Sequence, residues 1–237
     1  QAPHHSVTMA ALIGGGSRTL TPGAASLAHG GILFLDEAAE FAPSVLDSLR
    51  EPLESGVVNL HRSGIHARYP ASFQLVMASN PCPCGGRRGG RRCTCSSIAR
   101  RRYMARLSGP LLDRMDIRID VHTPTRADMA ASGASDSATI RERVCAARER
   151  SRHRLAGTPW TCNAQLPGVW IRRHSGIDAD LVAQLDRLVD AGASSMRGID
   201  RMLRLAWTLA DLDGAPTPTF DHIVAAQQLR NGHDHDN

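Results

Sequence analysis

The sequence of 237 residues contains no lysine, so arginine supplies all 28 of its basic side chains. This absence excludes the phosphate-binding loop G-x-x-x-x-G-K-[ST], which requires a lysine. The triple glycine Gly14–Gly16 is therefore not such a loop, and no clear strand precedes it. Codon bias from a GC-rich genome explains the arginines without invoking function. Nucleic-acid contact, for which guanidinium groups are well shaped, is the functional explanation, and a net charge of +5 gives it little support by itself.

The chain also lacks an apolar run near the roughly 18 residues that a membrane span requires, and no secretory signal opens it. We therefore expect no membrane partner. The six cysteines are clustered instead of being spread as a disulfide framework, which suits a reducing compartment and predicts a cytoplasmic location. The first residue is Gln1 and not Met, so we expect a fragment or a processed product.

The segment Gly30–Glu37 reads Gly-Gly-Ile-Leu-Phe-Leu-Asp-Glu. Its four apolar residues predict a short strand, buried on both faces, in a parallel sheet. Ligands of such sheets bind at the carboxyl ends of the strands, where Asp36 and Glu37 lie. Asp36 is suited to hold Mg²⁺ through water, and Glu37 to take a proton from an attacking water. An acidic residue that merely follows a strand and caps a helix is the simpler alternative.

Two further strands are predicted. Phe73–Ala78 is apolar and ends at Ser79-Asn80-Pro81. Asn80 is placed to orient a water or to contact a γ-phosphate, and a turn-forming Asn before proline is the alternative. Ile117–Val121 predicts the third strand. Between the first two, the pattern predicts one helix over residues 42–53, which Gly56 terminates, and then a hairpin over residues 57–69. Arg62 and Arg68 of the hairpin are candidate DNA contacts, with a plain surface hairpin as the alternative.

Two close cysteine pairs follow, Cys82-Pro-Cys84 and Cys93-Thr-Cys95. Four thiolates suit a Zn²⁺ site, although C-x-C spacing is a weaker signal than C-x-x-C, and unliganded thiols are the alternative. Basic residues surround the pairs, so this segment is also a candidate DNA-facing surface. Its arginines are Arg87, Arg88, Arg91 and Arg92, with Arg100–Arg102 following.

The second half of the chain is predicted to be helical, after a polar linker at residues 125–135. Helices are expected over residues 139–155, 178–189, 194–212 and 220–229, with an extended connector at residues 163–173. Arg197 lies in the first turn of the third of these helices, where a cation is unfavourable unless an anion is near. We therefore consider a phosphate-sensing role for Arg197, against that of an ordinary exposed arginine.

Arg114 lies just before the third predicted strand. We expect it either to form a salt bridge with Asp113 or Asp116 or to contact a phosphate held by a neighbouring subunit.

Several of these segments together resemble the magnesium-chelatase-subunit-like AAA+ ATPases of the ComM/YifB type. The resemblance runs from Ala2 to about Gly232. It rests on six motifs: Leu27–Glu37, Leu49–Glu54, Asn80–Gly85, Leu107–Arg114, Asn163–Pro167 and the helix from Arg197 to Leu212. The string Asn-Pro-Cys-Pro-Cys-Gly at Asn80–Gly85 is the most specific of them.

The resemblance implies an α/β fold. Residues 1–124 would form part of an AAA+ P-loop-type core, with a parallel sheet, flanking helices and a β-hairpin insert, and residues 136–237 an all-α lid. ATP and Mg²⁺ would be the ligands. Asp36 and Glu37 would be the Walker B pair, Asn80 the sensor-1 residue, Arg114 the arginine finger of a ring and Arg197 the sensor-2 arginine. The resemblance also implies a homo-oligomeric ring, which we expect to be a hexamer. It further implies a motor that remodels DNA, of a type linked to branch migration in recombination and transformation.

The sequence departs from the family pattern at Ala38-Ala39, where Leu-Pro is usual, and at Trp207, where arginine is usual. It also has no Walker A loop, which the family places upstream of the segment that begins at Gln1. We therefore expect the chain alone to bind nucleotide weakly at most and to show no useful turnover. The alternatives are a metal-chelatase motor subunit, a non-catalytic DNA-binding remnant that uses the Arg/Cys segment, and a zinc-structural scaffold.

Overall fold

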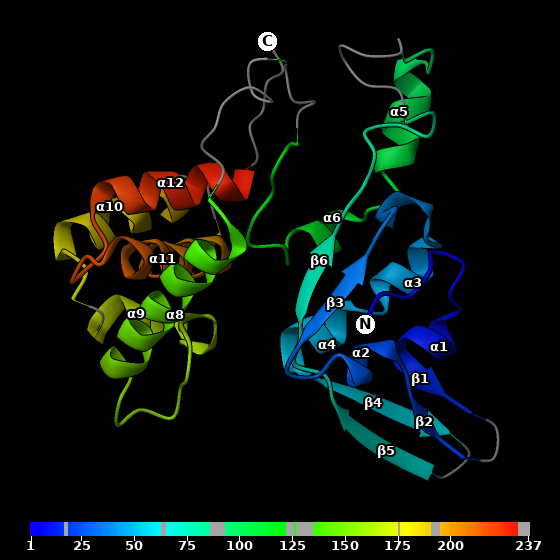
Figure 1. The fold of residues 1–237 in the computed structure, drawn as a ribbon, viewed down its shortest axis with the longest axis horizontal. Coiled ribbons are helices and arrows are strands. Elements are labelled where there is room, and N and C mark those ends of the chain that lie inside the picture. The colour runs from blue at the N-terminus through cyan, green and yellow to red at the C-terminus, as the bar shows by residue number, and fades with distance from the viewer. Residues whose placement is uncertain are drawn as a thin grey trace. The chain divides into compact units, whose positions relative to one another are not determined.

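The computed structural model describes residues 1–16, 19–62, 65–85, 93–121, 126, 135–174, 176–190 and 195–231. The chain divides into two compact units, Gln1–Met115 and Asp116–Asn237 (Figure 1). The first mixes helices and strands, whereas the elements described in the second are all helices. Of the linker predicted at residues 125–135, only Arg126 and Ser135 lie within the described residues.

Two parallel strands carry the centre of the first unit. β3 (Ile32–Leu35) pairs with β6 (Gln74–Met77), with Leu35 opposite Met77. The parallel sheet predicted from these two runs is confirmed. Burial on both faces is wrong, because Leu33 and Leu35 are fully buried whereas Ile32 and Phe34 are 53% and 36% exposed. Among the described residues, the core covers only one face of β3.

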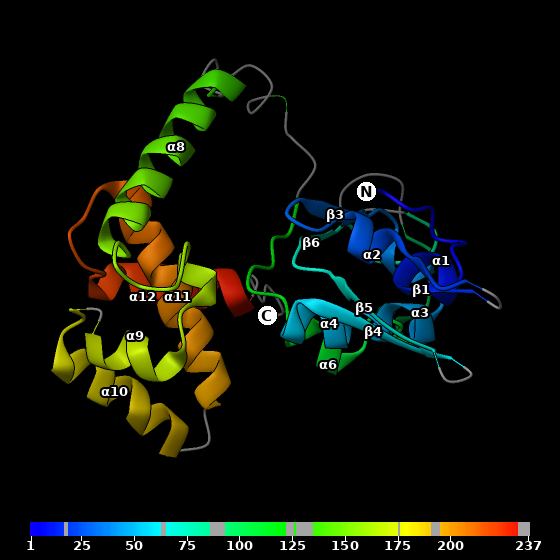
Figure 2. The same cartoon turned by 90° about the horizontal axis from the view of Figure 1, so that it is seen from below.

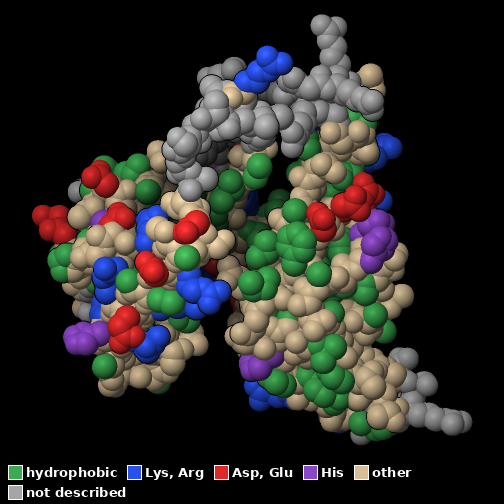
Figure 3. Space-filling model, in the orientation of Figure 1, with side chains coloured by type: hydrophobic (Ala, Val, Ile, Leu, Met, Phe, Trp, Pro, Cys, Tyr) green, Lys and Arg blue, Asp and Glu red, His purple; other side chains and the backbone are tan. Residues whose placement is uncertain are grey.

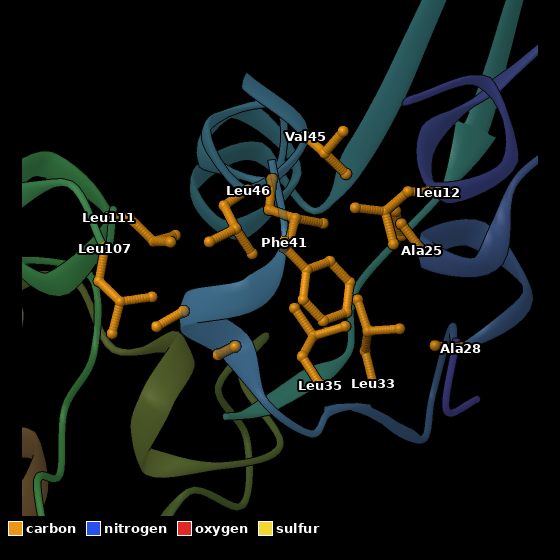
Figure 4. Packing of buried hydrophobic residues seen from close by; sticks show 14 of the residues in the cluster. Leu12, Ala25, Ala28, Leu33, Leu35, Phe41, Val45, Leu46, Leu107 and Leu111 are labelled. Carbon is orange, nitrogen blue, oxygen red and sulfur yellow. The ribbon is translucent and has the colours of Figure 1, made fainter. Parts of the chain in front are cut away.

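The core of this unit fixes the backbone that follows β3. The ring of Phe41 lies beside Leu33 and Leu35, with Leu46 and Leu111 nearby (Figure 4). All five side chains are at most 1% exposed, and burial of each stabilises the fold by about 1.5–3 kcal/mol. The turn between β3 and Phe41, which includes the 3-10 helix η1 (Ala38–Glu40), is therefore held at both ends by packing.

Two helices form where one was predicted, α3 (Pro43–Asp47) and α4 (Arg50–Ser55). A continuous helix would require the N–H of Pro52 to bond the carbonyl of Ser48, and proline has no N–H. The helix instead restarts at Arg50, which places Pro52 in a first turn, where the missing N–H costs nothing. Gly56 ends α4 in the left-handed region (φ 71°), as predicted.

The hairpin is confirmed, and the remaining elements of this unit are short. β4 (Val57–Arg62) and β5 (Ile65–Pro70) pair antiparallel. The other elements are α1 (Met9–Ile13), β1 (Gly14–Gly15), β2 (Thr21–Pro22), α2 (Ala24–Leu27), α5 (Ser97–Met104) and α6 (Gly109–Leu112).

The second unit is organised around α11 (Met196–Asp213), which packs against four other helices (Figure 2). These are α8 (Ser137–Arg154), α9 (Gly168–His174), α10 (Ala179–Asp190) and α12 (Phe220–Asn231), and the 3-10 helix η2 (Asn163–Gln165) also contacts α11. Trp207 of α11 is 1% exposed, with the Arg154 guanidinium 3.8 Å from its ring centroid.

Two predictions for this part of the chain are wrong. The extended connector predicted at residues 163–173 contains η2 and most of α9, because Pro167 and Gly168 stand at the start of a helix instead of interrupting the chain. The strand predicted at Ile117–Val121 is absent, and the N–H of Arg118 donates instead to the carbonyl of Leu229 in α12 (2.7 Å). Ile119 and Val121 are 69% and 83% exposed.

An ion pair between a partly buried arginine and a buried aspartate joins α8 to α11. Arg154 pairs with both carboxylate oxygens of Asp211, whose side chain is 3% exposed. Asn163 donates to the same carboxylate at 2.8 Å and accepts from Arg154 at 2.7 Å. The buried charge is thus fully hydrogen-bonded, as buried charges must be.

Candidate functional site

The predicted acidic pair and Asn80 emerge from neighbouring strands at the same edge of the sheet. Asp36 and Glu37 directly follow β3, and Asn80 lies three residues beyond β6. Two backbone bonds extend the pairing past the ends of the strands: Ala78 N–H donates to Leu35 (2.9 Å), and Ala38 N–H donates to Ala78 (2.8 Å). The acidic pair is thereby held beside the segment that leads to Asn80. All three polar side chains are exposed.

Glu37 has a left-handed backbone, with φ 52° and ψ 43°. Among the described residues it is the one non-glycine residue with positive φ. Such a conformation costs of order 1–3 kcal/mol and concentrates at functional sites, where the surrounding structure enforces it. The Glu37 N–H donates to the Asp36 carboxylate (2.9 Å), so the two acidic residues form one local unit. The conformation turns the chain sharply and presents the Glu37 side chain at the edge of the sheet.

His5 contacts Glu37, and no motif in the sequence marks His5 as part of this site. Its Nδ1 lies 3.0 Å from Oε2 of Glu37. The contact arises because Gln1 pairs with β3: its amino group donates to Ile32 (2.8 Å), and its carbonyl accepts from Phe34 (2.9 Å). Residues 1–5 therefore run beside β3 to its acidic end. No local pattern in the sequence signals this pairing.

Hydrogen bonds connect the segment just beyond the acidic pair to α5 and to the residues that follow it. The groups involved in this segment are the Ala39 carbonyl and the Glu40 carboxylate. Arg106 donates to the Ala39 carbonyl at 3.0 Å and to Glu40 at 3.2 Å. Burial, followed by a hydrogen bond with Glu40, raises the pKa of Tyr103 on α5. The position of α5 is therefore coupled to the turn that carries Asp36 and Glu37.

Arg114 pairs with neither of the aspartates considered from the sequence. Its Nη2 lies 2.6 Å from Oε2 of Glu54, and its Nη1 donates to the Pro110 carbonyl at 2.7 Å. The Arg114 side chain is 11% exposed. Arg114 thus occupies a fixed position against α4, and its role toward a neighbouring subunit stays a prediction.

Arg197 lies in the helical unit. It is exposed in the first turn of α11, which Ser195 caps by accepting a hydrogen bond from the N–H of Gly198 (3.0 Å). The phosphate-sensing role of Arg197 stays a prediction.

The structure covers the candidate DNA contacts in part. Arg68 is exposed on β5, and so are Arg100–Arg102 on α5. The side chain of Arg62 and the residues Arg87, Arg88, Arg91 and Arg92 lie outside the described residues. On the face shown in Figure 3, acidic and arginine side chains are interspersed over the helical unit, so this face has no single-sign patch there.

The two cysteine pairs come together. The sulfurs of Cys82, Cys84, Cys93 and Cys95 all lie within 4.8 Å of one another. Hydrogen bonding to Cys84, burial and hydrogen bonding to Cys93 raise the pKa of the Cys82 thiol to about 12. Cys145 and Cys162, on the helical unit, are exposed, and none of the six cysteines is in a disulfide.

An acidic pair after one parallel strand and a polar residue after its neighbour form an arrangement typical of nucleotide-hydrolysing α/β proteins. The comparison with known families is more specific. Residues 1–129 match the family described as magnesium chelatase, subunit ChlI, and residues 134–230 match the C-terminal family of the same subunit. The chain belongs to the magnesium chelatase subunit ChlI family.

Individual relatives agree with this assignment. The chain is 44% identical over 229 residues to an uncharacterized protein of Mycobacterium tuberculosis, 39% identical over 233 residues to YifB of Escherichia coli, and 40% identical over 232 residues to the competence protein ComM of Haemophilus influenzae. Each match covers 97% of this chain and 44–45% of the relative, so the chain spans about half the length of these proteins. The resemblance to the ComM/YifB type is confirmed. Among the described residues, no helix has the length and apolar character needed to cross a membrane.

Proposed function

We propose that this chain supplies the hydrolytic and sensing residues of an ATP-driven motor that remodels DNA. The observation that carries the proposal is the position of Asp36 and Glu37 beside the segment leading to Asn80, at one edge of a parallel sheet. Family membership supports an ATPase role, and similarity to a competence protein supports DNA as the substrate. The parent protein acts in the cytoplasm as a homo-oligomeric ring, a hexamer in this proposal.

The donor set suits ATP with Mg²⁺. Hard carboxylate oxygens and water are the ligands Mg²⁺ prefers, and Asp36 is exposed at the end of a strand. Asp36 holds the ion through water in this proposal, Glu37 accepts the proton of the attacking water, and Asn80 orients that water. Mg²⁺ supplies charge neutralisation on the phosphates. Arg114 contacts the phosphate held by a neighbouring subunit, and Arg197 senses the phosphate from the helical unit.

ATP hydrolysis by the protein encoded by the complete gene tests the role of Glu37. We expect Glu37→Gln to retain ATP binding and to reduce hydrolysis by about 10²–10⁴-fold, because the amide cannot accept the proton. Glu142→Gln, the same change on an exposed residue of α8, is the control and should leave hydrolysis unchanged. Hydrolysis by Glu37→Gln at the rate of the control would contradict the proposal.

DNA binding is tested separately through the exposed arginines of α5. Changing Arg100, Arg101 and Arg102 to alanine should weaken binding and lower the slope of log K against log salt by about one for each phosphate that these arginines neutralise. Changing Arg141, Arg143 and Arg148 of α8 removes the same charge from another exposed surface and should have a smaller effect. Equal effects of the two triple variants would remove the support for an interface on α5.

A further inference from the structure

The four clustered cysteines come from two short segments on either side of residues 86–92. The sulfur of Cys82 lies 3.3 Å from that of Cys84 and 3.4 Å from that of Cys93, and Cys84 lies 3.6 Å from Cys93. With Cys95 included, every pair of sulfurs is within 4.8 Å. Four sulfurs from two separate segments therefore converge on one small region.

Hydrophobic packing does not explain this convergence. Cys82 is buried, but Cys84 is exposed, and Cys93 and Cys95 are only partly buried. A buried cysteine behaves as a small apolar residue, whereas a half-exposed group of four has no core to fill. Disulfides do not explain it either, because none of these cysteines is bridged. A shared ligand explains both the proximity and the exposure.

We propose that Cys82, Cys84, Cys93 and Cys95 bind one Zn²⁺ ion as a tetrahedral Cys₄ site. Zinc–thiolate bonds of about 2.3 Å in a tetrahedron separate the sulfurs by about 3.8 Å, close to the separations present here. Soft thiolates in tetrahedral S₄ geometry select zinc or iron–sulfur chemistry. In a multi-iron cluster the thiolates bind different irons and stand farther apart, so a single ion fits this group better.

The local backbone supports both chelating pairs. Gly85 adopts a left-handed φ of 61°, and its N–H donates to the Cys82 carbonyl at 3.1 Å, so Cys82–Gly85 forms a tight turn. Cys95 directly precedes Ser96, which caps α5 by accepting a hydrogen bond from Ala99 N–H (3.2 Å). Each pair is thus adjacent to a backbone feature that limits its freedom before any metal binds, which lowers the entropic cost of closing the site.

The site has a structural role in this proposal. It joins the segment after Asn80 to the start of α5, while Arg106, two residues beyond the other end of α5, pairs with Glu40 at 3.2 Å. The metal therefore holds α5 at one end and the ion pair holds it at the other. All four positions are taken by thiolates, so the site has no open coordination position for catalysis.

The metal content of the protein from the complete gene, purified under reducing conditions without chelator, tests the proposal. We expect Cys84→Ser and Cys95→Ser each to contain one zinc less per chain than the unchanged protein. The reduction in zinc affinity should exceed the roughly 10–100-fold effect of removing an outer-shell partner. Cys145→Ser and Cys162→Ser, changes of the same kind at exposed cysteines outside the cluster, should retain all of the zinc.

A second measurement covers the case in which the serine variants fail to fold. A mercurial thiol reagent added to the unchanged protein should release this zinc as the cluster thiolates are modified, and Co²⁺ taken up in its place should give the intense visible bands of a tetrahedral thiolate site. Unchanged zinc content in both cluster variants would overturn the proposal. So would a Cys82–Cys84 disulfide in the reduced preparation, or iron in place of zinc. None of these outcomes depends on ATP hydrolysis, so this test is independent of the proposed motor function.

Discussion

The Nδ1 atom of His5 lies 3.0 Å from Oε2 of Glu37, although the two residues are 32 positions apart. Glu37 is, among the described residues, the one non-glycine residue with a left-handed backbone. The contact with His5 restrains its carboxylate. The His5 side chain is 32% exposed and that of Glu37 is 52% exposed, so both remain open to solvent. His5 is therefore placed to orient the proposed base and not to bury it.

Replacing His5 by alanine should slow ATP hydrolysis by the full-length protein. The carboxylate would lose its partner and sample more orientations, and misplacement of about 1 Å costs up to roughly 10²-fold in rate. We expect kcat to fall by about 10- to 100-fold with little change in KM, because no contact to nucleotide is removed. His153→Ala, on an exposed face of α8, is the control.

His5→Asn separates orientation from other effects of the change. An asparagine side chain still offers a hydrogen-bond donor to Glu37, so it should restore part of the rate that alanine loses. If His5→Ala and His153→Ala had the same kcat, the contact between His5 and Glu37 would have no part in hydrolysis.

Glu37→Gly should stabilise the fold relative to Glu37→Ala. Both changes remove the carboxylate, but only glycine relieves a left-handed conformation that costs other residues about 1–2 kcal/mol. Greater backbone entropy of glycine in the unfolded chain offsets roughly 0.5–1 kcal/mol of this gain. We therefore expect glycine to exceed alanine by about 0.5–1 kcal/mol in free energy of unfolding, measured by urea denaturation with circular dichroism. Equal stabilities would mean that the left-handed backbone costs the fold nothing.

Asp211→Ala should destabilise the helical unit by about 3–5 kcal/mol, because it leaves the partly buried Arg154 without its carboxylate. Asp213→Ala removes an acid that is 65% exposed and whose one ion pair within the described part of the chain is with His222 at 3.2 Å, so its effect should stay below about 1 kcal/mol. All three tryptophans, Trp160, Trp170 and Trp207, lie in this unit, and urea unfolding followed by their fluorescence reports on it. Similar destabilisation in the two variants would show that the buried pair adds little.

The sequence predicted those features of the fold that depend on neighbouring residues. The apolar runs identified β3 and β6. A glycine-containing loop between two strand-like runs identified the hairpin, and Gly56 identified the end of α4. The break between α3 and α4 was also readable from Pro52, but the apolar spacing through Leu53 obscured it. In contrast, the spacing of Pro167 and Gly168 suggested a connector, because proline and glycine mark both loops and the starts of helices.

The interactions that sequence reasoning missed are those between distant residues. His5 reaches Glu37 because Gln1 pairs with β3, and Arg114 pairs with Glu54 from 60 positions away. No local sequence pattern predicts either contact, since each depends on how separate elements pack against one another. The exposure of Ile32 and Phe34 was missed for a similar reason. An apolar run predicts a strand, but which faces are covered depends on the elements that pack against it.

The ion pair between Arg114 and Glu54 leads to a test of the arginine finger. Arg114 is held by Glu54 at 2.6 Å and is 11% exposed, so a purely structural role is the competing explanation. If Arg114 acts on a neighbouring subunit's phosphate, Arg114→Ala should reduce hydrolysis by about 10³-fold or more and leave ATP binding intact. Mixing Arg114→Ala with Glu37→Gln should then restore activity, because about one site in four of a randomly mixed ring combines an intact Glu37 with an intact neighbouring Arg114. Glu37→Gln mixed with itself is the control and should stay inactive. A structural Arg114 would give no recovery on mixing, since each Arg114→Ala subunit would carry its defect into every ring.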